Sequence, residues 1–264
     1  MPFMLHEWTA TFYLLAGVVA WLGLALRSPR LERHATVVLG VGTALNVAAL
    51  ATLHQLDPPP PLTDLPTAAS FAACVGTLFF LLLQGRARLA GLTVLVAPVA
   101  FVSVFYAALR IPHGGVPTFE SIAPWAHSHV LLASAGLACL AMSGVAGFLF
   151  LVEHRRIKAK RPLDPRFPLP SLEALDRVNL ASLAVGFPLL TLGLVTGLLW
   201  VHAVRGTFVA GGQHEVWLAV SWVVYAVLVA VRFAARQGAR PAAASAVAAF
   251  GFLTFAVIGV GLFA

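Results

Sequence analysis

The sequence predicts an all-α integral membrane protein, a bundle of about eight transmembrane helices with both termini on the outer, periplasmic side. Composition is the first observation behind this class. Of the 264 residues, 60% are hydrophobic and only 10% are charged, whereas soluble domains carry about 25% charged residues. Patterning is the second, because the apolar residues form long runs and no stretch shows the period-two alternation of a transmembrane barrel.

Long apolar segments define the expected spans, because a helix needs about 20 apolar residues to cross the hydrocarbon. The segments that meet this length are 8–26, 35–54, 66–84, 89–109, 129–152, 180–204, 216–233 and 242–263. The chain before the first span reads MPFMLHEW, without a basic n-region or a cleavage site, so we expect that span to be retained. None of the spans contains Asp, Glu or Lys, which disfavours a proton-driven pump. We expect a single transmembrane domain over residues 1–264.

Basic residues set the expected orientation. All Lys and Arg residues except Arg110 and Arg205 follow the first, third, fifth or seventh span, and so lie on one side. The positive-inside rule makes that side cytoplasmic. We therefore expect a multi-pass protein of the bacterial inner (cytoplasmic) membrane, with the basic loop 153–179 lying along an anionic inner-leaflet surface. The net charge of +7 then reflects topology and contact with the lipid bilayer, and no nucleic acid partner is expected.

Histidine has the opposite distribution. Every histidine except His34 and His154 lies outside or at an outer helix end. Neutral imidazole binds haem iron, zinc and copper. The sequence therefore predicts a ligand site at the outer face, and histidine number alone does not choose among these metals.

The segment Trp125-Ala126-His127-Ser128-His129 opens the fifth span. Pro124 precedes it, so the helix is expected to begin near Trp125. Residues two apart on a helix point about 200° away from each other. His127 and His129 therefore cannot serve one site together: one faces the bundle interior, and the other faces water or headgroups.

The connection between the sixth and seventh spans carries the other candidates. His202 follows Trp200 at the outer end of the sixth span, and His214 begins the seventh. A loop of about ten residues joins them, so the two helix ends must be neighbours. Within the sixth span, Gly193-x-x-x-Gly197 predicts a small-residue packing face.

Two stretches resemble the membrane core of the cytochrome c assembly family, which includes CcsA-type haem exporter/synthases, CcmC haem-delivery proteins and HemX-like proteins. They are LDRVNLASLAVGFPLLTLGLVTGLLW at residues 175–200, and His129-Val130 followed by LLASAGLACLAMSGVAGFLFLVEHRRIK. The resemblance covers roughly residues 125–232. It implies that haem is handled at the outer face by histidines and a tryptophan-rich loop, and His129 matches the family's external histidine.

The loop departs from the exporters' pattern. Their signature WxWDPKE corresponds here to VAGGQHE at residues 209–215, without either tryptophan or the aspartate. The short chain and this loop resemble the HemX-like branch most closely. We expect no enzymatic activity, because covalent haem attachment would need the missing signature. The expected function is haem binding or relay. The alternatives are haem delivery to cytochrome c with maturation proteins, and a non-haem scaffold that regulates a tetrapyrrole-pathway enzyme through the basic loop.

The histidines gained in this loop suggest a ligand hypothesis. His129 and His214 would hold a haem b by bis-imidazole ligation, and His202 is the alternative partner of His129. Trp200 or Trp125 would lie against the porphyrin ring. His127 remains a candidate at the same helix start.

Overall fold

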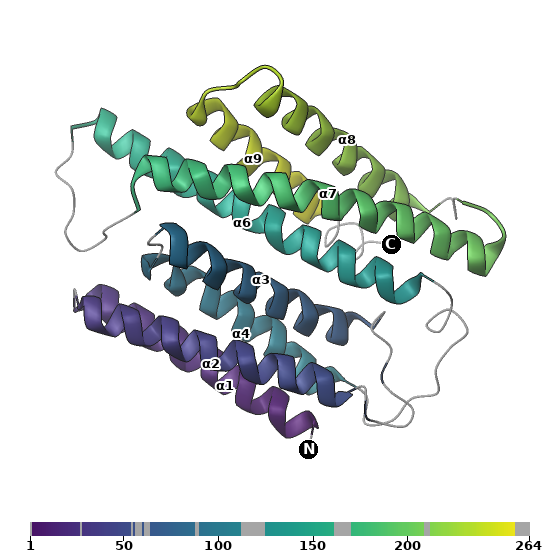
Figure 1. The fold of residues 1–264 in the computed structure, drawn as a ribbon, viewed down its shortest axis with the longest axis horizontal. Helices are drawn as coiled ribbons and strands as arrows, with labels where there is room; N and C mark the ends of the chain where they lie inside the picture. Colours follow the sequence, from purple (N-terminus) through teal and green to yellow (C-terminus); the bar gives the residue numbers. More distant parts are fainter. Residues whose placement is uncertain are drawn as a thin grey trace. The chain divides into compact units, whose positions relative to one another are not determined.

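The computed structural model describes residues 2–26, 28–53, 55, 60, 64–87, 90–111, 125–160, 170–208 and 212–256, and the regular secondary structure among them is helical. The side chains of residues 2, 3, 86, 87, 90, 213 and 214 lie outside this description. The helices are α1 (Pro2–Ala25), α2 (Pro29–Leu53), α3 (Leu65–Ala87), the 3-10 turn η1 (Ala90–Leu92), α4 (Thr93–Arg110), α6 (Ala126–Lys158), α7 (Leu172–Arg205), α8 (Gln213–Phe233) and α9 (Ala239–Thr254). Figure 1 shows their course.

Seven of the described helices are long and apolar enough to cross a membrane. They confirm the predicted all-α membrane class. The predicted eighth span, 242–263, begins in α9, which is described only as the 16 residues Ala239–Thr254, and it ends outside the described residues. The predicted outer location of both termini stays a prediction.

The chain divides into two compact units. The first unit contains α1 to α4, and the second contains α6 to α9. Each is described by itself below. The expectation of a single transmembrane domain over residues 1–264 stays a prediction.

A buried polar network joins the helices of the first unit. The Tyr13 hydroxyl lies 3.1 Å from Thr77 Oγ1, so it links α1 to α3. Asn46 Nδ2 on α2 donates to the Ser70 carbonyl on α3 at 3.2 Å, and Ser70 Oγ donates back to Asn46 Oδ1 at 3.0 Å. Because lipid offers no hydrogen bonds, such side-chain bonds hold transmembrane helices together.

Glycines bring the helices of the second unit into close contact. A Cβ on Gly136 of α6 would lie 2.7 Å from the backbone nitrogen of Leu190 on α7. A Cβ on Gly147 of α6 would lie 2.7 Å from the carbonyl oxygen of Ala243 on α9. Only glycine allows these backbone approaches, so α6 lies directly against both α7 and α9.

A polar contact and an apolar core complete the second unit. Trp222 Nε1 on α8 donates to Thr191 Oγ1 on α7 at 3.0 Å. In addition, buried side chains from all four helices pack into one apolar cluster. They are Leu140, Leu183, Tyr225, Leu228, Ala249 and Leu253.

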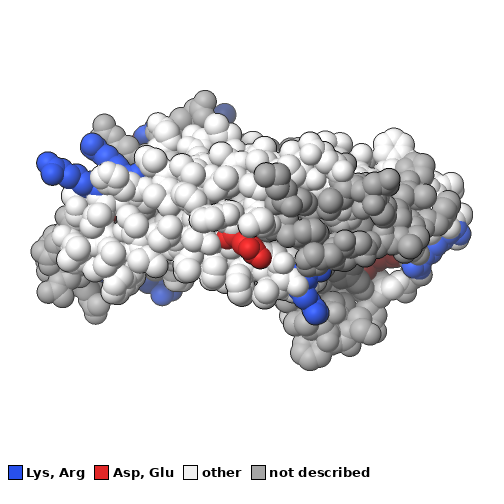
Figure 2. Space-filling view, turned by 90° about the horizontal axis from the view of Figure 1, so that it is seen from below, with Lys and Arg blue, Asp and Glu red and all other residues white. Residues whose placement is uncertain are grey.

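The molecular surface is largely apolar, as a lipid-facing protein requires. Exposed hydrophobic side chains repeat at helical spacing along α8, at Val216, Val220, Val223 and Val227. In Figure 2, charged side chains are few on the described part of the face shown, and an acidic side chain lies near its middle. This largely uncharged surface fits helices that cross hydrocarbon.

Candidate functional site: a histidine oriented by α7 at the α6–α7 helix ends

The start of α6 fixes the position of His129. Trp125 precedes the helix with a left-handed backbone (φ 74°), and its carbonyl accepts the backbone N–H of His129 at 2.8 Å. The helix begins at Ala126, which confirms the predicted start near Trp125. His129 thus closes the first turn of α6, where its side chain reaches α7.

The His129 ring is bonded to the backbone of α7. Its Nδ1 lies 2.8 Å from the Gly193 carbonyl oxygen. A carbonyl oxygen only accepts, so Nδ1 carries a proton, and the tautomer that fits this bond has its lone pair on Nε2. Metal-ligating histidines are oriented in this way, with the other ring nitrogen donating to a backbone carbonyl. The half-buried ring is therefore prepared to offer Nε2 to a metal.

Two glycines and a tryptophan on one face of α7 contact this ring. A Cβ on Gly197 would lie 2.8 Å from His129 Nδ1 and 2.9 Å from Cε1, so a larger residue would displace the imidazole. One turn further, the Trp200 ring lies 5.6 Å from the His129 ring, centroid to centroid, at 34°. The predicted small-residue face is therefore more than packing: Gly193 supplies the acceptor and Gly197 supplies the space.

His127 and Trp125 are directed differently. Both His127 and His129 lie in α6, and the exposed His127 is about 200° around the helix from His129. Trp125 is 48% exposed. The structure describes no contact that joins either residue to the His129 ring.

His202 is not brought to His129. It lies two residues beyond Trp200, on the other side of α7, and it stacks on Phe208 with ring centroids 4.3 Å apart. The backbone of His214 lies in the first turn of α8, but its side chain lies outside the described residues. The pairing of His129 with His214 therefore stays a prediction. Within the described part of the chain, no three His, Cys, Asp or Glu side chains group as a metal site.

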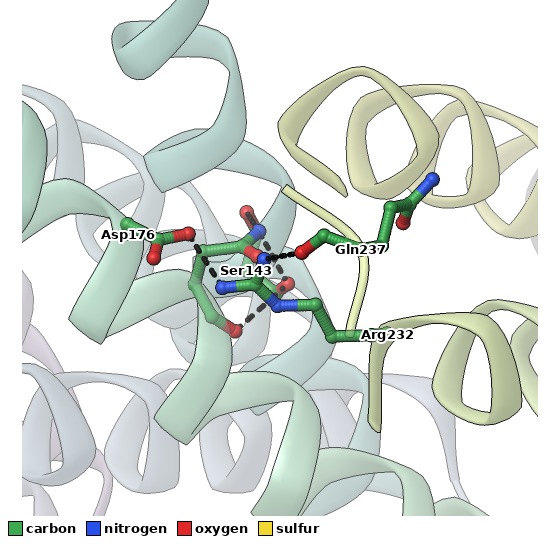
Figure 3. Close-up of polar contacts among 5 residues, drawn as sticks. Ser143, Asp176, Arg232 and Gln237 are labelled. Carbon is green, nitrogen blue, oxygen red and sulfur yellow. Dashed lines mark hydrogen bonds and ion pairs between the residues drawn. The ribbon is translucent and has the colours of Figure 1, made fainter. Parts of the chain in front are cut away.

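The opposite end of the second unit holds an ion pair that the sequence reasoning missed. Arg232 Nη2 on α8 donates to Asp176 Oδ1 on α7 at 2.7 Å, with the Arg232 side chain 7% exposed. Arg232 Nη1 also donates to the Gln237 carbonyl at 2.7 Å, as Figure 3 shows. The available signal was one charged residue at the end of each of two neighbouring spans. The ion pair lies at the helix ends opposite to His129 and joins α7, α8 and the turn into α9.

A comparison with known protein families identifies the family of this chain. The sequence profile described as Cytochrome C assembly protein matches residues 62–263. The chain belongs to this family. The match includes α6 to α8, and therefore His129, Gly193, Gly197 and Trp200.

Individual members of the cytochrome c assembly family are similar along most of the chain. A cytochrome c biogenesis protein CcsA of Synechococcus sp. (strain JA-3-3Ab) is 25% identical over 299 residues, covering 91% of this chain and 86% of the relative. The CcsA of Mesostigma viride is 24% identical over 229 residues, covering 76% of this chain and 73% of the relative. The CcsA of Chlamydomonas reinhardtii is 26% identical and covers 86% of this chain and 65% of the relative.

Proposed function

We propose that the protein binds haem at the helix ends that hold His129, with His129 Nε2 as an iron ligand, and handles this haem in cytochrome c assembly. The observation that carries the proposal is the His129 Nδ1–Gly193 contact of 2.8 Å, which leaves Nε2 free to coordinate. The family supports the context, since its relatives are named cytochrome c biogenesis proteins.

The residues around His129 fit a porphyrin. When bound, haem would supply an iron that His129 Nε2 could ligate. The Trp200 indole beside the imidazole offers a flat apolar surface against which a porphyrin can pack. Haem b is the form proposed, because covalent attachment is not needed for ligation by histidine. His214 is the proposed second ligand, since the start of α8 follows the α7 end after a short loop.

The charge distribution supports an outer-face location for this site. Arg155, Arg156, Lys158 and Lys160 lie at the opposite end of α6 from His129. By the positive-inside rule, the basic end is cytoplasmic and the His129 end faces outward. For a bacterial host, we propose the inner membrane as the location. An insertion assay with cysteine labels at the two ends of α6 tests this orientation, and outward labelling of the basic end would contradict it.

The loop sequence supports a role without catalysis. VAGGQHE at residues 209–215 lacks the tryptophans and aspartate of the exporters' loop, so we propose a HemX-like haem-binding role and no covalent attachment. Deletion of the gene separates the roles. Loss of all c-type cytochromes would establish delivery to maturation proteins as the function. A change in tetrapyrrole intermediates with normal c-type cytochromes would favour regulation of a pathway enzyme.

Purified variants test the ligand itself. His129→Ala is expected to lose most bound haem, and added imidazole is expected to restore it by occupying the vacated position. His127→Ala is the matched control, because His127 lies in the same helical turn and is exposed. Equal haem content in both variants would contradict the assignment of His129.

A further inference from the structure

Two basic residues at one end of the second unit have a left-handed backbone conformation. Lys160 follows α6 with φ 50°, and Arg236 follows α8 with φ 49°. Glycine is the usual residue at such left-handed positions after a helix, because side chains with a Cβ are strained there. Strain that persists points to a use for the side chain, and here both side chains are basic.

These two residues belong to a larger group of exposed cations. Arg155, Lys158, Lys160, Arg236 and Arg240 are exposed, and we call them the basic rim. Among the described residues, the ion pairs use Arg156, Arg177 and Arg232 instead. The rim therefore presents positive charge that no described carboxylate neutralises.

The two parts of the rim lie at the same end of the unit. The contact between Gly147 and Ala243 places the start of α9 beside the second half of α6. In Figure 1, the end of α6, the start of α7 and the turn between α8 and α9 all lie toward the upper left. The rim thus combines residues from two helix ends at one end of the unit.

Arg232 holds the α8–α9 part of this surface in place. Its guanidinium donates to Asp176 on α7 and to the Gln237 carbonyl in the turn, both at 2.7 Å (Figure 3). The turn that carries Arg236 and Arg240 is therefore fixed to the helix bundle. A fixed pair of cations loses less freedom on binding an anion than a mobile pair would.

Exposed apolar side chains close to these cations in the sequence favour a lipid headgroup as the bound anion. Ile157 is 53% exposed and Phe233 is 46% exposed, next to Lys158 and close to Arg236 in the sequence. At about 1.5 Å per residue, the 33 residues of α6 exceed a hydrocarbon thickness of about 30 Å. The rim therefore lies at headgroup depth, where acyl chains can cover Ile157 and Phe233 while phosphates face the cations.

We propose that the basic rim binds the headgroups of anionic phospholipids. The structure combines exposed cations, apolar neighbours and a fixed turn at the depth where such headgroups lie. Phosphatidylglycerol is the simplest probe of this chemistry. The proposal is independent of haem binding, because the rim and His129 lie at opposite ends of α6.

The test uses the full chain in bilayer discs of mixed phosphatidylcholine and phosphatidylglycerol, with bound lipid measured by native mass spectrometry. The variant Lys160→Gly/Arg236→Gly is expected to melt at a higher temperature, because glycine relieves the left-handed strain. It is also expected to retain several-fold less phosphatidylglycerol. Lys160→Arg/Arg236→Lys keeps the charge and is expected to retain the lipid. Arg205→Gln, an exposed cation at the end of α7 far from the Leu172 start, is the control.

Each result decides the proposal. Equal retention of phosphatidylglycerol by the wild type and the glycine variant would overturn it, and so would an equal loss in the Arg205→Gln control. Inorganic phosphate supplied to the lipid-free protein in detergent distinguishes the source of the anion. If phosphate alone raises the melting temperature as much as phosphatidylglycerol does, the rim is a site for a soluble anion and the lipid proposal is wrong.

Discussion

The Nδ1 atom of His129 on α6 donates to the carbonyl oxygen of Gly193 on α7 across 2.8 Å. This bond connects two residues that are 64 positions apart and fixes which ring nitrogen is available as a ligand. The same carbonyl accepts the Thr196 hydroxyl at 3.0 Å. The imidazole is therefore oriented by the backbone of a neighbouring helix.

The first prediction concerns the effect of filling the space at Gly197. Gly197→Ala places a Cβ within 3 Å of the ring atoms Nδ1 and Cε1, so the ring must turn away from Gly193. Disturbing such an orienting contact weakens metal binding by roughly 10–100-fold, and overpacking costs about 1–3 kcal/mol of stability. Haem titration of the purified variant measures the first effect.

Gly251→Ala is the control for this substitution. A Cβ on Gly251 of α9 meets no atom within 4 Å, and alanine in a helix is favoured over glycine by roughly 0.5–1 kcal/mol. Haem affinity is expected to be unchanged. Wild-type affinity in Gly197→Ala would show that the ring position does not matter for binding.

The next prediction concerns which histidine is the second ligand, His214 or His202. Because His202 stacks on Phe208 away from the His129 face of α7, His202→Ala is expected to keep the low-spin haem spectrum. His214→Ala is expected to convert it to a high-spin spectrum, since one axial imidazole is lost. The reverse result would make His202 the partner of His129.

The ion pair at the opposite helix ends contributes stability. Asp176→Ala leaves the Arg232 guanidinium buried without its carboxylate, and breaking such a pair costs about 3–5 kcal/mol when it is fully buried. Asp176 is 28% exposed, so we expect the lower end of that range. Unfolding in mixed micelles measures the loss.

Glu173→Ala provides the comparison on the same helix. It removes an exposed ion pair with Arg177. The Glu173 side chain is 79% exposed and the Arg177 side chain is 69% exposed, and such pairs contribute roughly 0.3–0.5 kcal/mol. Equal losses in the two variants would mean that burial adds nothing to the Asp176–Arg232 contact.

The Asn46–Ser70 bonds give a prediction for the first unit. Asn46→Ala removes two hydrogen bonds between α2 and α3 and is expected to cost roughly 1–2 kcal/mol in the membrane. Ser103→Ala removes only an exposed bond to Val99 within its own helix. A smaller loss for Asn46→Ala than for Ser103→Ala would contradict the role of this network.

The helices could largely be predicted from hydropathy, because lipid requires long apolar runs and allows few other backbone structures. The start of α7 shows the limit. The expected span began at residue 180, whereas the helix begins at Leu172, capped by Ser171 Oγ, which accepts the Ala174 N–H at 3.2 Å. Polar residues hid this extra length, because Glu173, Asp176 and Arg177 interrupt the apolar run before residue 180.

The geometry around His129 could be predicted from the sequence only in part. Histidine distribution directed attention to His129, and helical spacing separated it from His127. The acceptor at Gly193 could not be found in this way, because every residue has a backbone carbonyl and only packing decides which one meets the imidazole. Likewise, no pattern in the sequence shows that His202 turns toward Phe208.

The visible absorption spectrum of the purified protein, recorded oxidised and then reduced, tests the central claim most directly. Ligation by His129 with a second imidazole predicts a sharp Soret band and split bands after reduction, and this spectrum is expected to disappear in His129→Ala. A wild-type protein that remains colourless after haem is supplied would contradict haem binding at this site.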